Sequence, residues 1–361
     1  MLEALEEHFD INLVVRDPFP AWFVFVRRVV RRLTAGLIDI MWSPFLTTLI
    51  GRPTLDTIKA ADCDFVFAVA VTPLCANLVS FGPTVFVSDA TQALLSNYNP
   101  FQKRLAPWVK RSARELETRA INGAAVCLFP SPWAASSAIA DHEGIADRVV
   151  TVPWGANLIA EHFTPPEARS STEWRLLFVG VDWHWKGGDI ALAAVEEMRK
   201  RNPGVHIDVV GSVPSAPPPQ IDGVTFHGFL NKNKPMESER LASLFRGADL
   251  LFLPTLSDAL GIVFAEAASY AIPAVSYATG GVPAMVIHQE TGLLLDAGAD
   301  AHAFATAMTE LLEDRDRYIK MSRAALERSR KVLNWPAWGR RVAGELTARR
   351  TDHSSVASGG A

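Results

Sequence analysis

The chain has 361 residues, of which 49% are hydrophobic and 20% charged. This composition is globular, long enough for two domains, and excludes a disordered or fibrous protein. The formal net charge of -4 lacks the basic excess of nucleic-acid binders, so no nucleic-acid partner is expected. The N-terminus MLEALEEHFD is acidic where a signal peptide starts basic, and no uncharged apolar run reaches membrane-spanning length. We therefore expect a cytoplasmic protein.

The three cysteines, Cys63, Cys75 and Cys127, lie in or beside apolar runs and lack metal-ligand spacing. This pattern favours buried free thiols in a reducing compartment.

The first predicted elements are a helix over 2–8, a strand over 11–15 (INLVV) and a basic amphipathic helix within 19–37. One face of that last helix would carry Trp22, Val26, Val29, Val30 and Leu33, and the other Arg27, Arg28, Arg31 and Arg32. Such a helix can lie on the inner, anionic face of a membrane, so peripheral membrane contact through 19–37 is one hypothesis. A domain helix with a solvated charged face is the alternative.

Strands and helices then alternate, which predicts parallel sheets covered by helices. The predicted strands are 64–71, 83–89, 124–131, 148–157, 175–180, 205–211, 224–229, 249–254 and 273–278. The predicted helices are 73–79, 107–122, one from Ser131, 188–201, 236–246, 258–270, 299–313, 315–331 and 335–349. Residues 161–174 read as a linker. Asp89 ends a strand, where a parallel sheet places functional residues.

The segment from Gly180 to Gly188 (GVDWHWKGG) follows a predicted strand and precedes a predicted helix. It would therefore lie at the carboxyl-end crevice of a sheet. Its glycines permit close backbone approach, and Lys186 supplies a charge for phosphate. The segment has neither the P-loop spacing nor the dinucleotide fingerprint. A surface lysine beside a turn is the alternative interpretation.

Two acids, Asp258 and Glu266, stand with seven residues between them. Asp258 is predicted at or near a helix N-cap, where free amides favour an anion, although ordinary capping explains it equally well. Glu266 lies about 12 Å further along the helix, among apolar neighbours. Its carboxylate needs a partner there, either sugar or ribose hydroxyls or a nearby lysine or arginine.

Gly280 and Gly281 follow the next predicted strand, with Pro283 near a helix start. They predict a tight turn with exposed N–H groups, although it could be only a turn. Three such motifs at consecutive strand ends indicate a crevice that binds a phosphate-bearing ligand.

Together, Gly-x5-Lys-Gly, acid-x7-Glu, Gly-Gly-x-Pro and Thr-Gly-Leu-Leu-Leu resemble the retaining family 4 (group 1) glycosyltransferases of the GT-B fold. Residues 153–157 (PWGAN) are similar to that family's Pro-x-Gly-x-Asp/Asn hinge, and the resemblance spans about residues 60–345. It implies an α/β protein with two Rossmann-like domains whose parallel sheets face each other across a cleft. The acceptor-side domain would be 1–158, completed by a crossing helix over 335–350. The nucleotide-sugar domain would be 159–334, and 351–361 a disordered tail.

The resemblance also implies roles for individual residues. Lys186 would hold the donor diphosphate beside Gly180 and Gly187, Asp258 the sugar hydroxyls, and Glu266 the ribose. The remaining implied donor contacts are Leu260, Gly261 and Ile262 at sugar and phosphate, Gly228, Phe229 and Leu230 at the base, and Gly280 and Gly281 at the cleft floor. The candidate catalytic residues are Asp258, Lys186 and Asp89. The family retains anomeric configuration, uses no enzyme nucleophile and implies neither metal nor cofactor, since a donor phosphate oxygen takes the acceptor proton.

The sequence departs from the family pattern in three ways. Asp258 stands where glutamate is usual. Val181 stands where arginine is common, and His184 would either compensate for it or simply face solvent. The family starts with a strand and a Gly-rich turn, whereas this chain starts with a helix and INLVV. Either a misassigned start removes upstream residues, or the sheet is rebuilt.

We therefore expect a retaining glycosyltransferase with a nucleotide-sugar donor and an unidentified acceptor, whether a glycan, a lipid-linked glycan or a small molecule. A non-catalytic or regulatory protein that binds a nucleotide sugar without turnover is the alternative. A nucleotide-sugar epimerase of the same fold is disfavoured, because that group lacks the Lys-Gly and acid-x7-Glu combination.

Overall fold

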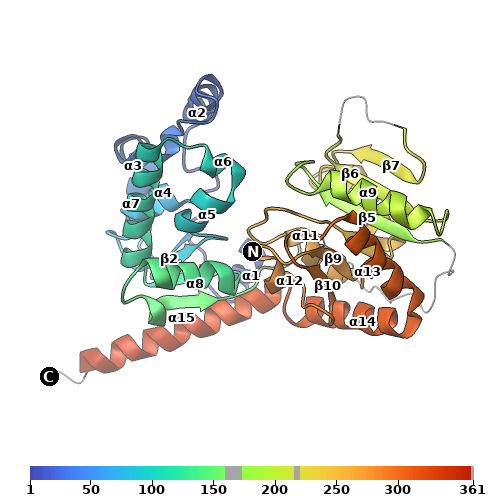
Figure 1. Ribbon diagram of the computed structural model, residues 1–361. Helices are drawn as coiled ribbons and strands as arrows, with labels where there is room; N and C mark the ends of the chain where they lie inside the picture. Colours follow the sequence, from blue (N-terminus) through green and yellow to red (C-terminus); the bar gives the residue numbers. More distant parts are fainter. Residues whose placement is uncertain (159–172, 215–219, 359–361) are drawn as a thin grey trace. The chain divides into compact units, whose positions relative to one another are not determined.

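A computed structural model describes residues 1–158, 173–214 and 220–358 (Figure 1). The chain divides into two compact units. The N-terminal unit comprises Leu2–Val152 and Gly339–Ala361, and the C-terminal unit comprises Pro153–Trp338 together with Met1. The boundaries expected from the sequence were 158/159 and 334/335. Each unit has its own parallel sheet, which confirms the predicted pair of Rossmann-like domains.

The N-terminal unit is built on four parallel strands in the order β1-β2-β3-β4. They are β1 (Val66–Val69), β2 (Thr84–Val87), β3 (Val126–Phe129) and β4 (Val149–Thr151). Every residue of β2 and β3 is buried, as expected for apolar strands that helices cover on both faces. The helices after β1 are α4 (Thr72–Leu78), α5 (Gln92–Tyr98), α6 (Pro100–Lys103), α7 (Pro107–Gly123) and α8 (Pro132–Asp141).

The first 60 residues contain α1 (Leu2–Glu6), α2 (Ala21–Leu33), the 3-10 helix η1 (Ile40–Trp42) and α3 (Pro44–Ala60). The predicted strand over 11–15 is wrong, since these residues form no strand and Leu13, Val14 and Val15 are exposed. In the described part of the sheet, edge strand β1 pairs with β2 alone, so INLVV has no ladder partner. The sequence prediction missed α3. Ser43 caps this helix, but Pro53 in its interior is a residue that usually argues against a helix.

The orientation of α2 also corrects the sequence prediction. Phe23 is its buried residue, and Arg27 and Arg31 turn inward to the buried carboxylate of Asp39. The four arginines therefore do not share a solvated face. Trp22, Val26, Val29 and Leu33, which the domain-helix alternative would bury, are exposed. No described helix is long and apolar enough to span a bilayer.

The C-terminal unit has six parallel strands in the order β10-β9-β8-β5-β6-β7. They are β5 (Arg175–Gly180), β6 (His206–Gly211), β7 (Val224–Gly228), β8 (Leu250–Phe252), β9 (Ala274–Tyr277) and β10 (Gly292–Leu295), the last of which was predicted only as a motif. The helices are α9 (Gly188–Arg199), α10 (Pro235–Gly247), α11 (Ile262–Ser269), α12 (Val282–Met285), α13 (Ala301–Glu313) and α14 (Arg315–Lys331). Helix α9 packs beside α13 (Figure 1), and helix α11 also contacts α14.

The last helix, α15 (Trp335–Ser358), begins in the C-terminal unit and continues in the N-terminal unit. The PWGAN segment packs on its start: Ala156 N donates to Leu333 O at 3.2 Å, and Trp335 Nε1 donates to Asn157 Oδ1 at 3.2 Å. The predicted helix end near 349 is wrong, because no Gly or Pro interrupts residues 345–358. The predicted linker 161–174 lies almost entirely outside the described residues, as does the end of the predicted tail.

Candidate functional site

The C-terminal sheet has a topological switch point between β5 and β8. These strands are neighbours, with Leu176 opposite Leu250, yet β5 leads to β6 on one side and β8 leads to β9 on the other. The connections that leave β5 and β8 therefore lead to strands on opposite sides of this pair. Ligands of open α/β sheets bind in the crevice at such a point. Both predicted phosphate and acid motifs begin there.

The two loops are bonded to each other. Trp185 O accepts from Leu256 N at 2.8 Å and from Thr255 Oγ1 at 3.1 Å. Gly187 has a φ of +74°, and a Cβ there would lie 2.0 Å from Pro254 O. Gly187 is thus required by close packing within the protein, a reason that the sequence motif alone did not give.

Lys186 and Asp258 meet across this junction. Lys186 Nζ lies 2.5 Å from Asp258 Oδ2, and both side chains are mostly buried. Gly180 makes room for the lysine, because a Cβ at Gly180 would lie 2.8 Å from Lys186 Cγ. The lysine is therefore not the freely solvated surface residue of the alternative interpretation. The ion pair places one cation and one acid side by side at the switch point.

Helix α11 begins four residues later than predicted, at Ile262, with Gly261 as its N-cap at a φ of +76°. Asp258 is therefore not the N-cap of this helix. It lies in the preceding loop, where its Oδ1 accepts from Leu260 N at 3.2 Å. The left-handed conformation of Gly261 ends the loop and sets the helix direction. Phe264 N already donates to Gly261 O at 3.0 Å, so the amides of Ile262 and Val263 at the helix start are the ones that suit an anion.

Glu266 is fully buried on α11, and both of its carboxylate oxygens accept from Lys232 Nζ, at 2.5 and 2.6 Å. The structure thus supplies the lysine partner that was the alternative to ribose hydroxyls. Lys232 itself is exposed, in the loop that follows β7. Sequence reasoning missed it, because a lysine in a polar loop gives no periodic signal. Only the fold brings residues 34 positions apart together.

The other predicted donor contacts lie at carboxyl ends of strands in the same sheet. Gly228 ends β7 at a φ of +67°, followed by exposed Phe229 and buried Leu230. Gly280 and Gly281 follow β9, and Gly281 N donates to Asp258 O at 3.3 Å. A Cβ at Gly281 would lie 1.9 Å from Ala259 O, so this turn holds the Asp258 loop in place.

Val181 and His184 are both exposed in the turn after β5. Val181 supplies no charge there, and the His184 ring packs edge-on against Trp185, with centroids 5.0 Å apart. The exposure of His184 fits the simpler of its two sequence interpretations.

Asp89 lies in the N-terminal unit, half-buried just after β2. Near it, Gln92 N donates to both oxygens of Glu117, at 2.8 and 2.7 Å. Burial raises the pKa of the Glu117 carboxyl to about 8, against the lowering effect of that hydrogen bond. The acid of this unit with the clearest perturbation is therefore Glu117, which the sequence motifs did not single out.

The cysteines differ from one another. Cys75 and Cys127 are buried, and burial raises the pKa of each thiol to about 12. Cys63 is exposed, so the prediction of three buried thiols is wrong at that position.

Among the described residues, no three His, Cys, Asp or Glu side chains gather to hold a metal ion. Independence from metals stays a prediction.

Comparisons with known proteins agree with this architecture. Residues 173–314 match the family model described as Glycosyl transferases group 1. A D-inositol 3-phosphate glycosyltransferase from Corynebacterium efficiens is 30% identical over 210 residues, covering 53% of this chain and 49% of the relative. Another from Corynebacterium diphtheriae is 27% identical over 243 residues, covering 62% and 56%. The chain thus spans about half the length of the curated relatives it matches.

Solved structures share the fold at low identity. A sucrose-phosphate synthase from Thermosynechococcus elongatus has a TM-score of 0.65 at 20% identity, covering 84% of this chain and 78% of that one. Anabaena HepE, solved in complex with UDP-glucose, has a TM-score of 0.63 at 16% identity, covering 84% of each chain. The predicted family resemblance is confirmed: residues 173–314 form a group 1 glycosyltransferase domain, in a chain with the GT-B fold.

Proposed function

We propose that this protein is a retaining glycosyltransferase that binds a nucleotide-sugar donor through its C-terminal unit. The observation that carries the proposal is the junction of Lys186, Asp258 and the first turn of α11 at the switch point between β5 and β8. A cation and helix amides suit a diphosphate, and an adjacent carboxylate suits sugar hydroxyls. The relatives are named as glycosyltransferases, and HepE was solved in complex with UDP-glucose, which supports a nucleotide-sugar donor.

In this proposal Lys186 releases Asp258 when the donor binds and pairs with the diphosphate. Asp258 then accepts hydrogen bonds from the transferred sugar. The acceptor hydroxyl attacks the anomeric carbon on the face that the diphosphate leaves, and a phosphate oxygen takes its proton. Lys186 and the α11 amides stabilise the charge that develops on the leaving diphosphate. No residue of the chain has to form a covalent intermediate, and no metal is required.

The acceptor stays unassigned, and we propose that the N-terminal unit binds most of it. Asp89 is the candidate catalytic residue of that unit, because it follows the buried strand β2. The comparisons do not favour a donor-binding protein without turnover, since the matched family model and the two curated relatives are named as transferases. A membrane contact through residues 19–37 also stays a prediction. The packing of α2 decides which of its side chains are exposed for such a contact.

Titration calorimetry with UDP, GDP and ADP tests the donor site. We expect one of these diphosphates to bind the wild type. Lys186→Ala should weaken it roughly 10- to 100-fold, because a hydrogen bond to a charged group is worth about 1.5–3 kcal/mol. Lys320→Ala, which removes an exposed lysine on α14 of the same unit, is the matched control and should leave the affinity unchanged. Equal binding by the Lys186 variant, or no binding of any diphosphate by the wild type, would refute the site.

Turnover is tested separately, by following hydrolysis of a panel of nucleotide sugars by NMR. We expect one donor to be hydrolysed, with the released sugar first appearing in the anomeric configuration of the donor. Inversion would disprove the retaining mechanism and leave donor binding intact. Binding without hydrolysis of any donor, and without transfer to any acceptor tried, would favour the non-catalytic alternative.

A further inference from the structure

Helix α2 of the N-terminal unit presents an apolar stripe to solvent. The stripe consists of Trp22, Phe25, Val26, Val29 and Leu33, which recur at helical spacing along one side of the helix. Trp22, Phe25 and Leu33 are 59%, 63% and 81% exposed. A helix that only completed a domain would bury such a stripe. In α2 the buried side is instead the one that carries Phe23, whose ring centroid lies 5.5 Å from that of Phe19.

The same packing places two arginines of α2 near a buried carboxylate and leaves the other two exposed. Arg27 donates to Asp39 through Nε at 2.7 Å and through Nη2 at 2.8 Å, and Arg31 Nε lies 3.8 Å from the same carboxylate. Asp39 is buried, so the doubly bonded guanidinium of Arg27 is structural, whereas the side chain of Arg31 is 41% exposed and makes only the longer contact. Arg28 and Arg32 are exposed beside the apolar stripe. The outward face of α2 therefore combines large apolar side chains with two arginines that form no ion pair within the described part of the chain.

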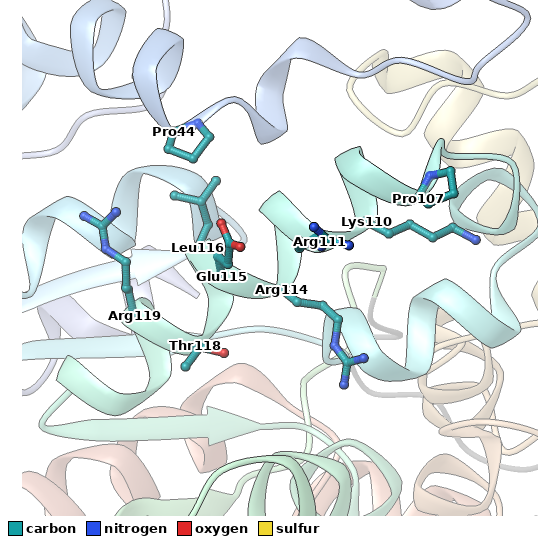
Figure 2. A pocket seen from close by; sticks show the side chains of 9 residues that line it. All are labelled: Pro44, Pro107, Lys110, Arg111, Arg114, Glu115, Leu116, Thr118 and Arg119. Atoms are coloured by element: carbon teal, nitrogen blue, oxygen red, sulfur yellow. The ribbon is translucent and has the colours of Figure 1, made fainter.

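Further exposed apolar side chains lie on elements that are joined to α2. Ala106 N donates to Leu37 O at 2.8 Å, which joins exposed Leu37 to the start of α7 and to exposed Trp108. The 3-10 helix η1 contacts α2, α3 and α7, so these elements form one body. A pocket of about 760 Å³ runs along α7, and Figure 2 shows four cations, Lys110, Arg111, Arg114 and Arg119, and one acid, Glu115, around it.

The charge of these segments is opposite to that of the whole chain. Residues 19–37 carry four arginines and 100–114 carry five lysines and arginines, and neither segment contains an Asp or Glu, although the chain has a net charge of -4. Apolar side chains flanked by cations fit a surface that is apolar inside and anionic outside. A lipid bilayer with acidic headgroups has that chemistry.

We propose that the outward face of α2 docks this protein onto an anionic lipid bilayer. The stripe lies in the interface between headgroups and acyl chains, and Arg28 and Arg32 contact headgroup phosphates. The basic residues of 100–114 add long-range attraction. The inference does not depend on the proposed transferase activity. It assigns the contact to two of the four arginines, whereas the sequence pattern assigned all four to one face.

Vesicle sedimentation of the full chain tests this inference, with phosphatidylcholine vesicles and with equal parts of phosphatidylcholine and phosphatidylglycerol. We expect binding to the mixed vesicles alone. Arg28→Gln with Arg32→Gln should lower the partition coefficient roughly 25-fold, at about fivefold per arginine. Phe25→Ser with Leu33→Ser should lower it at least about 100-fold, because burial of each side chain contributes about tenfold or more. All four positions are solvent-exposed, and circular dichroism will verify that each variant is folded.

Two substitutions in the C-terminal unit are matched controls. Met236, on α10, is 88% exposed, and Arg323 is exposed on α14, so Met236→Ser and Arg323→Gln remove the same chemistry elsewhere and should leave binding unchanged. Failure of the wild type to bind the mixed vesicles, or equal binding to phosphatidylcholine alone, would overturn the inference. So would sedimentation equilibrium without lipid showing an oligomer that Phe25→Ser with Leu33→Ser dissociates, because the face would then join two copies of the chain.

Discussion

Lys186 Nζ and Asp258 Oδ2 lie 2.5 Å apart, although the two residues are 72 positions apart in the sequence. One belongs to the turn after β5 and the other to the loop after β8. The residue proposed to hold the diphosphate is therefore joined to the residue proposed to hold the sugar. A donor that engages both must first separate them, so the two groups make opposite contributions to diphosphate binding.

Asp258→Asn should separate these contributions. The substitution removes the carboxylate that competes for Lys186, so we expect UDP, or whichever diphosphate binds, to bind at least as tightly as to the wild type. Transfer or donor hydrolysis should fall roughly 10- to 100-fold, because a charged acceptor of sugar hydroxyls is lost. Calorimetry and initial rates measure the two quantities. Weaker diphosphate binding together with unchanged kcat would contradict the assigned roles.

The Lys232–Glu266 pair should respond asymmetrically to substitution. Glu266 is fully buried and Lys232 is exposed, so Lys232→Ala strands a buried carboxylate, whereas Glu266→Gln leaves a lysine that can turn to solvent. We expect Lys232→Ala to lower the free energy of unfolding by about 3 kcal/mol or more, and Glu266→Gln by clearly less. Urea denaturation measures both. The double variant should regain part of the loss of Lys232→Ala, and strict additivity of the two effects would show that the pair is uncoupled.

Gly187 should tolerate no side chain. Its φ of +74° disfavours an L-residue, and a Cβ would lie 2.0 Å from Pro254 O. We expect Gly187→Ala to cost about 3 kcal/mol or more of unfolding free energy and to disturb diphosphate binding by moving the Lys186 turn. Gly247, at the end of α10, is the matched control, because nothing lies within 4 Å of its Cβ position. Thermal melts of both variants measure the effect, and Gly247→Ala should be neutral or slightly stabilising.

Glu117 should make stability fall as the pH rises. Burial raises its pKa to about 8 in the folded chain, whereas the carboxyl of the unfolded chain titrates near 4.5. Between these pH values the folded state holds a proton that the unfolded state has lost. The contribution of Glu117 to the free energy of unfolding is therefore fully present below about pH 4.5 and is lost as the pH rises towards 8. Relative to Glu117→Gln, the wild type should lose about 1.4 kcal/mol per pH unit in this range. Urea denaturation at several pH values measures the free energy of unfolding of both proteins. If it changes with pH in the same way in both, the pH dependence belongs to groups other than Glu117.

Much of the C-terminal unit could be predicted from the sequence. Strand β5 and helix α14 have the predicted bounds, since an unbroken apolar run and a long amphipathic period are local signals. The position of the three motifs after strands, which are β5, β8 and β9, was also readable from the sequence, because apolar runs followed by turn residues mark strand ends. Helix α11 was predicted four residues too early, since Ser257 and Asp258 resemble a cap that Gly261 provides.

Tertiary structure decided the rest. The sequence determined two α/β units, the motifs at the strand ends and the candidate cation and acids, because these follow from local periodicity and residue chemistry. It could not decide that Lys186 pairs with Asp258, that Lys232 satisfies Glu266, or that α2 turns Phe23, Arg27 and Arg31 inward. Such pairings depend on which distant surfaces the fold brings together. A charge or an apolar stripe has the same local pattern whether it is buried, paired or exposed.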